Sequence, residues 1–378
     1  MAIGNRRSTL RAHVLLLAFL FFTSGLLTAQ TIAPDTYEAL QYRHIGPVGN
    51  RIASVAGIPG DPMTYYVGAA SGGIWKTVDG GLFWTPVFDD HPVHAIGALA
   101  VSMSDPEIVW AGTGEPHIRS NVTIGNGVWK STDGGDTWQH MGLDATGRIA
   151  RVLIHPTNPE IVYVASLGHS HAPQAERGIY RTADGGATWA QVLFVDEHTG
   201  ASSLEMDPNN PRILYAGMWQ VLANTWGRQS GGPGSGLFVS RDAGDSWTKL
   251  EGHGLPTRPL GKVDVCLTPA DSNRIYALLE TGDGVPLHGE ETDSGELWRS
   301  DDGAETWQLM TYDRNFGGRT AYYNNCAVAP DDPDEAYFLT APFVKSIDGG
   351  RTGVVQGGRS RQVETITTFG LIHAMVIG

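Results

Sequence analysis

Four basic residues stand one or two positions after a glycine, at the start of segments that are widely spaced along the chain. They are Arg51, Arg148, Lys262 and Arg319. Four cations gathered at one end of a set of strands would hold an anion such as a carboxylate. The alternative is that each cation donates to backbone carbonyls or to an acid in its own neighbourhood. The sequence leaves both interpretations open.

Three further candidate ligand-binding residues lie in longer polar segments between apolar runs. Glu115 and Arg119 lie within 112–126, and Trp226 lies within 219–236. Long insertions in repeat proteins are where binding residues gather, with neutral loop growth as the alternative. Glu115 is the best single acid, although ordering of its own loop is the simpler role, and we assign no catalytic residue. Polysaccharide binding would use exposed aromatic residues such as Trp219 and Trp226.

Motifs for metals, cofactors and nucleic acids are weak in this chain. His169, His171 and Glu176 lack a firm further ligand, so we expect no metal site and no cofactor. The sequence contains no Gly-x-Ser-x-Gly, no His-Glu-x-x-His and no phosphate-binding glycine loop. The net charge of −14, without a basic run, argues against nucleic acid as a partner.

These residues are set within a repeat. Its clearest copy is Ser131-Thr132-Asp133-Gly134-Gly135-Asp136-Thr137-Trp138, and its aspartate recurs at steps of 54, 51, 58, 60 and 46 residues. The six aspartates are Asp79, Asp133, Asp184, Asp242, Asp302 and Asp348. Asp-Gly-Gly between apolar runs is typical of a hairpin turn, because the glycines adopt positive φ and the carboxylate accepts backbone N–H groups. We therefore expect all six to be structural.

A second pattern alternates with the first: an apolar strand, a turn with Pro, Asn or Asp, and another apolar strand. Each period of about 50 residues then holds four antiparallel strands, as in one propeller blade. The sequence predicts an all-β fold, a β-propeller of six to seven four-stranded blades, with six periods visible. The copies of the repeat around the six aspartates, which we call boxes, join the third and fourth strands of each blade. They therefore lie at the opposite end of the blade from the long loops.

The ends of the chain differ from the repeats. Residues 1–29 are predicted to be a signal peptide, with Arg6, Arg7 and Arg11 before a short apolar run. Residues 30–50 form a lead-in, 51–353 the propeller, and 354–378 an irregular tail that contains an apolar candidate for a closing strand. We expect a secreted or periplasmic protein with no membrane span after signal removal. In an oxidising compartment Cys266 and Cys326 would form a bridge, with buried free thiols as the alternative.

The repeated box resembles that of the BNR or Asp-box β-propellers, which include sialidases, xyloglucanases, the sortilin N-terminal domain and photosystem assembly propellers. The span 42–350 resembles large secreted bacterial proteins labelled sortilin-like or glycosyl-hydrolase-like. The resemblance implies a β-propeller without fixing its reaction. Sialidases begin their arginine triad in a Phe/Tyr-Arg-Ile-Pro motif, whereas Arg51 and Arg148 here precede Ile-Ala. Xyloglucanases carry a catalytic Asp where this chain has Ala70.

From these observations we expect a secreted, non-catalytic β-propeller that binds protein or peptide ligands, as sortilin-like propellers do. The alternative is a glycan-binding or glycoside-hydrolase-like propeller with a polysaccharide ligand. Arg51, Arg148 and Arg319 would bind the anionic end group of a peptide. An assembly factor or structural scaffold is a third reading, for which the sequence offers no separate support.

Overall fold

The computed structural model describes residues 51–118, 123–281, 297–317, 322, 324–340 and 342–356. All of them belong to the compact unit Asn50–Gly378. The predicted signal peptide, the lead-in, Arg119, Arg319 and residues 357–378 lie outside the described residues. Within the described part, no helix has the length and apolar character needed to cross a bilayer.

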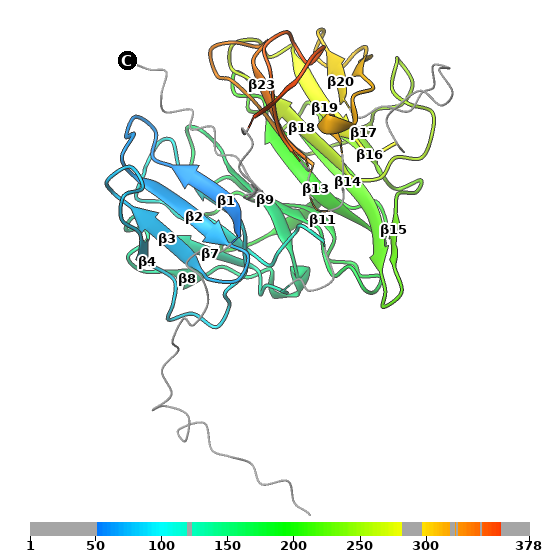
Figure 1. The fold of residues 1–378 in the computed structure, drawn as a ribbon. Coiled ribbons are helices and arrows are strands. Elements are labelled where there is room, and N and C mark those ends of the chain that lie inside the picture. Colours follow the sequence, from blue (N-terminus) through cyan, green and yellow to red (C-terminus); the bar gives the residue numbers. More distant parts are fainter. Residues whose placement is uncertain are drawn as a thin grey trace, which may run out of the picture. The chain divides into compact units, whose positions relative to one another are not determined.

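Six antiparallel sheets follow one another along the chain, and we call them blades one to six (Figure 1). Blade one contains β1 (Ile52–Gly57), β2 (Tyr65–Ala69), β3 (Ile74–Thr77) and β4 (Thr85–Pro86). Blade two contains β5 (Ile96–Val101), β6 (Val109–Thr113), β7 (Val128–Ser131) and β8 (Gln139–His140). Blade three contains β9 (Ile149–Ile154), β10 (Val162–Ser166), β11 (Gly178–Thr182) and β12 (Ala190–Leu193).

The later blades are built in the same way. Blade four contains β13 (Thr199–Met206), β14 (Leu214–Ala223), β16 (Gly236–Ser240) and β17 (Thr248–Lys249), and β15 (Arg228–Ser230) pairs with the end of β14. Blade five contains β18 (Val263–Leu267), β19 (Ile275–Leu279), β20 (Leu297–Ser300) and β21 (Gln308–Thr311). Blade six contains β22 (Asn325–Val328), β23 (Ala336–Leu339), β24 (Phe343–Ser346) and β25 (Val354–Gln356). Two short 3-10 turns, Asp144–Thr146 and Arg314–Phe316, precede blades three and six.

The chain is thus a six-bladed, all-β propeller, which confirms the predicted fold class. Strands in each blade pair with their neighbours in sequence order, and all the pairs are antiparallel. The last described strand, β25, lies wholly beyond residue 353, where we expected the propeller to end. Blade four differs from the expectation as well, because much of the predicted loop 219–236 is strand.

The core consists of apolar clusters between neighbouring blades. Each of five clusters combines residues from two consecutive blades, from the pair of blades one and two to the pair of blades five and six. Because strand side chains alternate, a blade with a neighbour on both faces is apolar on both. β19 shows this, since all five of its residues are buried. Loss of a large side chain such as Trp110 would cost about 3–5 kcal/mol.

Each Asp box closes its own turn. In blade two the Oδ1 of Asp133 accepts the Thr137 amide at 2.8 Å and the Ser131 hydroxyl at 2.7 Å. Its Oδ2 accepts the Thr137 hydroxyl at 2.5 Å, and Gly134 and Gly135 have φ of 66° and 92°. The side-chain hydrogen bond from Thr137, followed by its backbone amide, lowers the pKa of Asp133 to about 2. The leading Ser or Thr donates to the box aspartate in all six copies.

A second contact, which the sequence analysis missed, joins each blade to the next. A cation of one blade donates to the carbonyl that follows the box aspartate in the next blade, and we call this the box contact. Its five instances are Lys76 to Gly134, Lys130 to Gly185, Arg181 to Ala243, Arg241 to Gly303 and Arg299 to Gly349. Four of these cations directly precede the first Ser or Thr of their own box, so the signal was present in the sequence.

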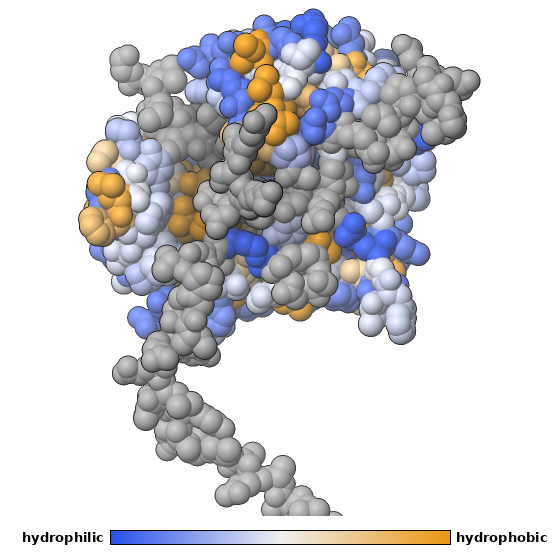
Figure 2. Space-filling view, in the orientation of Figure 1, coloured by the Kyte–Doolittle hydropathy of each residue, from blue (hydrophilic) through white to orange (hydrophobic). Residues whose placement is uncertain are grey.

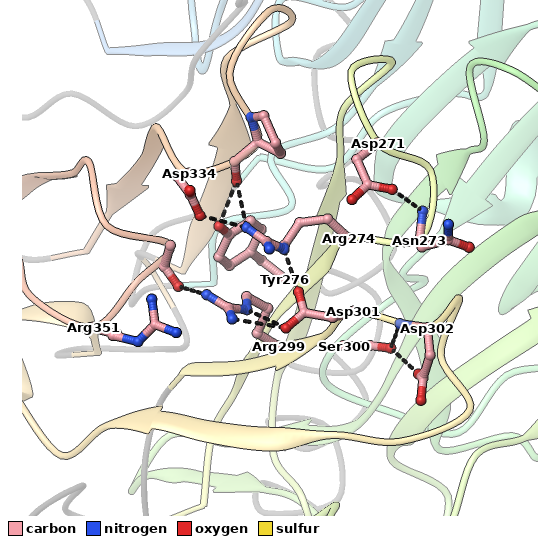
Figure 3. A network of polar contacts seen from close by, with 12 residues as sticks. Asp271, Asn273, Arg274, Tyr276, Arg299, Ser300, Asp301, Asp302, Asp334 and Arg351 are labelled. Carbon is pink, nitrogen blue, oxygen red and sulfur yellow. Dashed lines mark hydrogen bonds and ion pairs between the residues drawn. The ribbon is translucent and has the colours of Figure 1, made fainter.

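The box contact between blades five and six lies in a wider polar network (Figure 3). Arg299 donates to the Gly349 carbonyl at 2.7 Å and to Asp301 at 2.8 Å. Arg274 lies between Asp301 and Asp334, and its Nη1 is 2.6 Å from Asp334. These charges connect the two blades at the end where the boxes lie.

Candidate functional site

A cavity of about 320 Å³ lies among the first strands of all six blades. Small and aliphatic residues line most of it, and the charged side chains that line it are Arg151 of β9 and Glu205 of β13. Nη2 of Arg151 is 3.3 Å from Oδ1 of Asp264, a buried residue of β18. The other oxygen of Asp264 accepts the Cys326 amide at 2.8 Å. Charged side chains of blades three and five thus meet across the axis of the propeller.

Glu205 is the titratable group of this cavity. Burial raises the pKa of Glu205 to about 7, the charge of Arg151 acts in the opposite direction, and the nearby Asp264 adds to the rise. The carboxyl group therefore changes its charge near neutral pH, inside a cavity that already holds one ion pair.

The cavity wall contains a disulfide. Cys266 of β18 and Cys326 of β22 are bridged, with their Cα atoms 5.8 Å apart. The two cysteines are 60 residues apart and belong to the first strands of blades five and six. Of the two states that the sequence left open, the structure thus has the bridge.

We call the end of the central cavity on the side of the long loops the channel mouth. Three blades contribute to one polar cluster there. Arg51 precedes β1, Glu115 follows β6, and Tyr322 precedes β22. Nη1 of Arg51 donates to Glu115 Oε1 at 2.5 Å and to the Tyr322 hydroxyl at 3.0 Å. Burial lowers the pKa of Arg51, but the hydrogen bonds with Glu115 and Tyr322 outweigh it, and the pKa is raised. The side chain of Arg51 is 25% exposed, whereas that of Glu115 is 2% exposed.

His117 and Lys262 extend this cluster. The His117 ring lies edge-on to Tyr322, with the ring centroids 6.0 Å apart. Burial, together with the charges of Lys262 and Arg151, lowers the pKa of His117 to about 3, so its imidazole is neutral. Burial also lowers the pKa of Lys262 to about 8. The Lys262 ammonium lies over the ring of Trp219, 6.0 Å from its centroid.

Arg148 is completely buried, and its Nη1 donates to the Gly168 carbonyl at 3.1 Å within its own blade. Burial lowers the pKa of Arg148, and the charge of Glu115 opposes that effect. Arg51 and Arg148 therefore make the carbonyl and acid contacts that the structural alternative describes. Both also experience the charge of Glu115, which places one acid within the influence of two of the predicted cations.

The remaining candidates are dispersed. Trp226 lies between β14 and β15 and is 93% exposed, but Trp219 is fully buried in β14, so the expectation of an exposed Trp219 was wrong. Trp219 faces inward because β14 continues through this region instead of ending in a loop. His171 contacts the Ala223 carbonyl, and the described residues contain no group of three or more side chains suited to a metal ion.

Sequence reasoning missed Arg151, Asp264, Glu205 and Tyr322. His117 lies in the polar segment 112–126 that it singled out, but was given no role of its own. Asp264 did carry a signal, because it is an acid within the otherwise apolar strand β18. Tyr322 carried none, since its role depends on how the segment before β22 reaches Arg51.

The fold and the channel define a β-propeller, and comparisons with known proteins agree. The family model of sortilin, neurotensin receptor 3, matches residues 126–256. A xyloglucanase of a Paenibacillus species is 25% identical over 322 residues, which cover 74% of this chain and 29% of that protein. The photosystem II assembly lipoprotein Ycf48 of Synechococcus sp. (strain CC9902) is 26% identical over 206 residues, covering 48% of this chain and 57% of that protein.

Solved structures show the same fold. The GH74 enzyme of Niastella koreensis superposes with a TM-score of 0.60 at 19% identity, covering 79% of this chain and 45% of that chain. YCF48 bound to D1 peptide superposes with a TM-score of 0.52 at 17% identity, covering 84% and 87%. The chain spans less than a third of the length of the curated xyloglucanases that it matches. These matches support a relationship with the β-propeller superfamily that contains these proteins.

Proposed function

We propose that this propeller is a binding module for a protein or peptide, and that it binds an acidic group of its ligand at the channel mouth. The observation that carries the proposal is the convergence of Arg51, Glu115 and Tyr322 from three blades at one end of the central cavity. Arg51 retains partial exposure, so a ligand carboxylate can approach its guanidinium.

The charges of the mouth suit this ligand. A guanidinium that a buried carboxylate already holds in place loses little further conformational freedom when the ligand binds, which favours affinity. Lys262 adds positive charge below about pH 8, because its pKa is lowered to that value. Arg148 lies deeper and would contribute only through its field. Arg119 and Arg319 remain candidates of the same site.

The proposal includes a location outside the cytoplasm. The disulfide between Cys266 and Cys326 is typical of an oxidising compartment. The predicted signal peptide of residues 1–29 points the same way. Export would be tested by determining the amino-terminal residue of the protein recovered from the periplasm or medium.

The binding proposal is tested with an array of octapeptides that carry either a free carboxylate or an amide at their ends. We expect the full chain to prefer free carboxylates, and Arg51→Ala to weaken binding about 10-fold or more, since a charge-assisted hydrogen bond contributes about 1.5–3 kcal/mol. The matched control is Arg241→Ala, which removes a half-exposed arginine at the box end. Binding that is equal in Arg51→Ala and the parent chain would reject the site, provided that both are folded.

A second candidate function is polysaccharide binding. The match to xyloglucanases and the 93% exposure of Trp226 favour it, because an exposed indole can stack on a sugar ring. Affinity electrophoresis in a xyloglucan gel tests it. Retardation that Trp226→Ala abolishes would support glycan binding, and unretarded migration of the parent chain would reject it.

A further inference from the structure

The box contact has an orderly direction that runs through the whole propeller. In each of the five described junctions, the earlier blade supplies the cation and the later blade supplies the turn carbonyl. An aromatic residue of the second strand supports the cation: Lys76 lies 5.5 Å from the ring centroid of Tyr66, and Lys130 lies 5.4 Å from that of Trp110. The pair is therefore a preassembled receptor for an Asp-box turn.

Blade six contains the same pair. Tyr337 of β23 lies directly opposite Lys345 of β24, as Tyr66 lies opposite Lys76, and the Lys345 ammonium is 5.3 Å from the Tyr337 centroid. Lys345 also directly precedes the first Ser of its own box. Here the pair contacts an acid: Lys345 Nζ is 2.8 Å from Glu335 Oε1, and the Tyr337 hydroxyl donates to the same carboxylate. Glu335 thus occupies the acceptor role that a turn carbonyl has elsewhere.

Blade one presents the complementary feature. The Gly80 amide donates to the backbone carbonyl of Met63, just as the Gly134 amide donates to the backbone carbonyl of Glu107. The carbonyl of Gly134 receives Lys76, but no cation of the described residues makes the corresponding box contact with Gly80. The box of blade one is also apolar at its surface, with Val78, Leu82 and Phe83 exposed by 66%, 78% and 79%.

The outer faces of blades one and six are the two sheet faces outside the five clusters. In blade one, Val55, Val67 and Trp75 lie opposite one another in the register and remain partly exposed, whereas Tyr66 and Ile74 on the other face are fully buried.

In blade six, Val354 of β25 lies opposite Lys345 and is 65% exposed, and Ile347 of its box is 69% exposed. Figure 2 shows hydrophobic surface over blade one at the left and over blade six at the top.

We propose that the seam, which we define as these outer faces of blades one and six, receives one further four-stranded sheet with its own Asp box, whose turn carbonyl binds Lys345. Residues 1–50 and 357–378 contain no Ser/Thr-x-Asp-Gly-Gly sequence, so the sheet belongs to another stretch of polypeptide. A single inserted sheet covers both faces at once. A second copy of this chain would leave one face of each copy open, because such a contact is heterologous.

The seam is separate from the ligand site proposed above. The box contact lies at the end of the blades where the Asp boxes lie, whereas Arg51 and Tyr322 bridge blades one and six at the mouth. The inserted sheet would lie outside this bridge. Failure of one proposal therefore leaves the other untouched.

The test uses the full chain and a fluorescent synthetic hairpin of residues 127–140, which contains the box that Lys76 binds in the folded protein. Fluorescence anisotropy should show saturable binding that Lys345→Ala weakens at least fivefold. Arg351→Ala is the matched control, since it removes an exposed cation from the same box of blade six and should leave binding unchanged. A hairpin with Asp133→Ala, which cannot close its turn, should not bind.

Three results would overturn the proposal: no saturable binding to a chain whose circular dichroism is unaltered, equal binding by Lys345→Ala, or occupation of the seam by a second copy. Sedimentation velocity detects the last of these as a dimer that Phe83→Asp disperses. Thr137→Asp changes the equivalent position in the box of blade two and serves as the control for that variant.

Discussion

Arg151 of blade three and Asp264 of blade five form an ion pair across the central cavity, with Nη2 and Oδ1 3.3 Å apart. Asp264 is fully buried, while Arg151 is partly exposed to the cavity. The pair therefore connects two blades that are not neighbours in the sequence.

Removal of Arg151 should be costly, because it leaves the Asp264 carboxylate buried without its cation. We expect Arg151→Ala to lower the free energy of unfolding by about 3 kcal/mol. The double variant Arg151→Ala/Asp264→Asn should recover part of this loss, since the neutral amide no longer needs a counter-charge. Urea unfolding, monitored by tryptophan fluorescence, measures the free energy of unfolding of both variants. Equal stabilities of the parent chain and Arg151→Ala would contradict the expected role.

Glu205 should make stability depend on pH. Its folded pKa, about 7, lies above its ordinary value, so the folded protein binds this proton more tightly than the unfolded chain. The contribution is complete at acid pH and is lost as the pH rises toward about 7. Glu205→Gln should therefore stabilise the protein at pH 8 by on the order of 2 kcal/mol and leave it nearly unchanged at pH 4. Thermal melts at the two pH values test this sign.

The box aspartates should act on stability alone. Asp133→Ala removes three acceptor contacts of its turn, from Ser131 and from the amide and hydroxyl of Thr137. We expect a lower midpoint of thermal unfolding and unchanged ligand binding at the channel mouth. Asp133→Asn, which retains one carbonyl acceptor, should have an unfolding midpoint between those of the parent chain and Asp133→Ala. A box variant that melts like the parent chain but has lost ligand binding would show that the aspartate has a direct role in the site.

Reduction should destabilise the last two blades. The bridge between Cys266 and Cys326 closes a loop of 60 residues, for which chain entropy gives about 4 kcal/mol. Unfolding in the presence and absence of dithiothreitol measures this difference. The double variant Cys266→Ala/Cys326→Ala should match the reduced protein and should not respond to the reductant.

The repeat made the fold predictable, because a turn with Ser or Thr, then Asp, then two residues of positive φ recurs only where the local geometry recurs. Strand positions followed from the apolar runs between the repeated turns, as in β6 and β10. Trp219 shows the limit of this reasoning: a Gly-rich segment after it suggested a loop, but pairing with β13 and β15 kept it in a buried strand. Pairing partners of that kind are not visible in local composition.

The candidate site was less predictable, since it depends on which blades face each other. Glu115 and Arg51 were both singled out, but 64 residues separate them and no local pattern indicates their hydrogen bond. The cation of the box contact could have been predicted from the sequence, because a Lys or Arg precedes most boxes. Its partner is a backbone carbonyl of the next repeat, which no side-chain motif records.

The disulfide gives the propeller a strong end and a weak end. In a structure whose repeats contact chiefly their neighbours, unfolding begins at the terminal repeats, which have only one packed face. A covalent bridge between Cys266 and Cys326 joins blade six to blade five, whereas the contacts described between blade one and blade two are non-covalent: packing, the Lys76 contact and the Arg51–Glu115 ion pair. Fraying in an oxidising medium should therefore start at blade one, where amide exchange and proteolytic nicks would first appear.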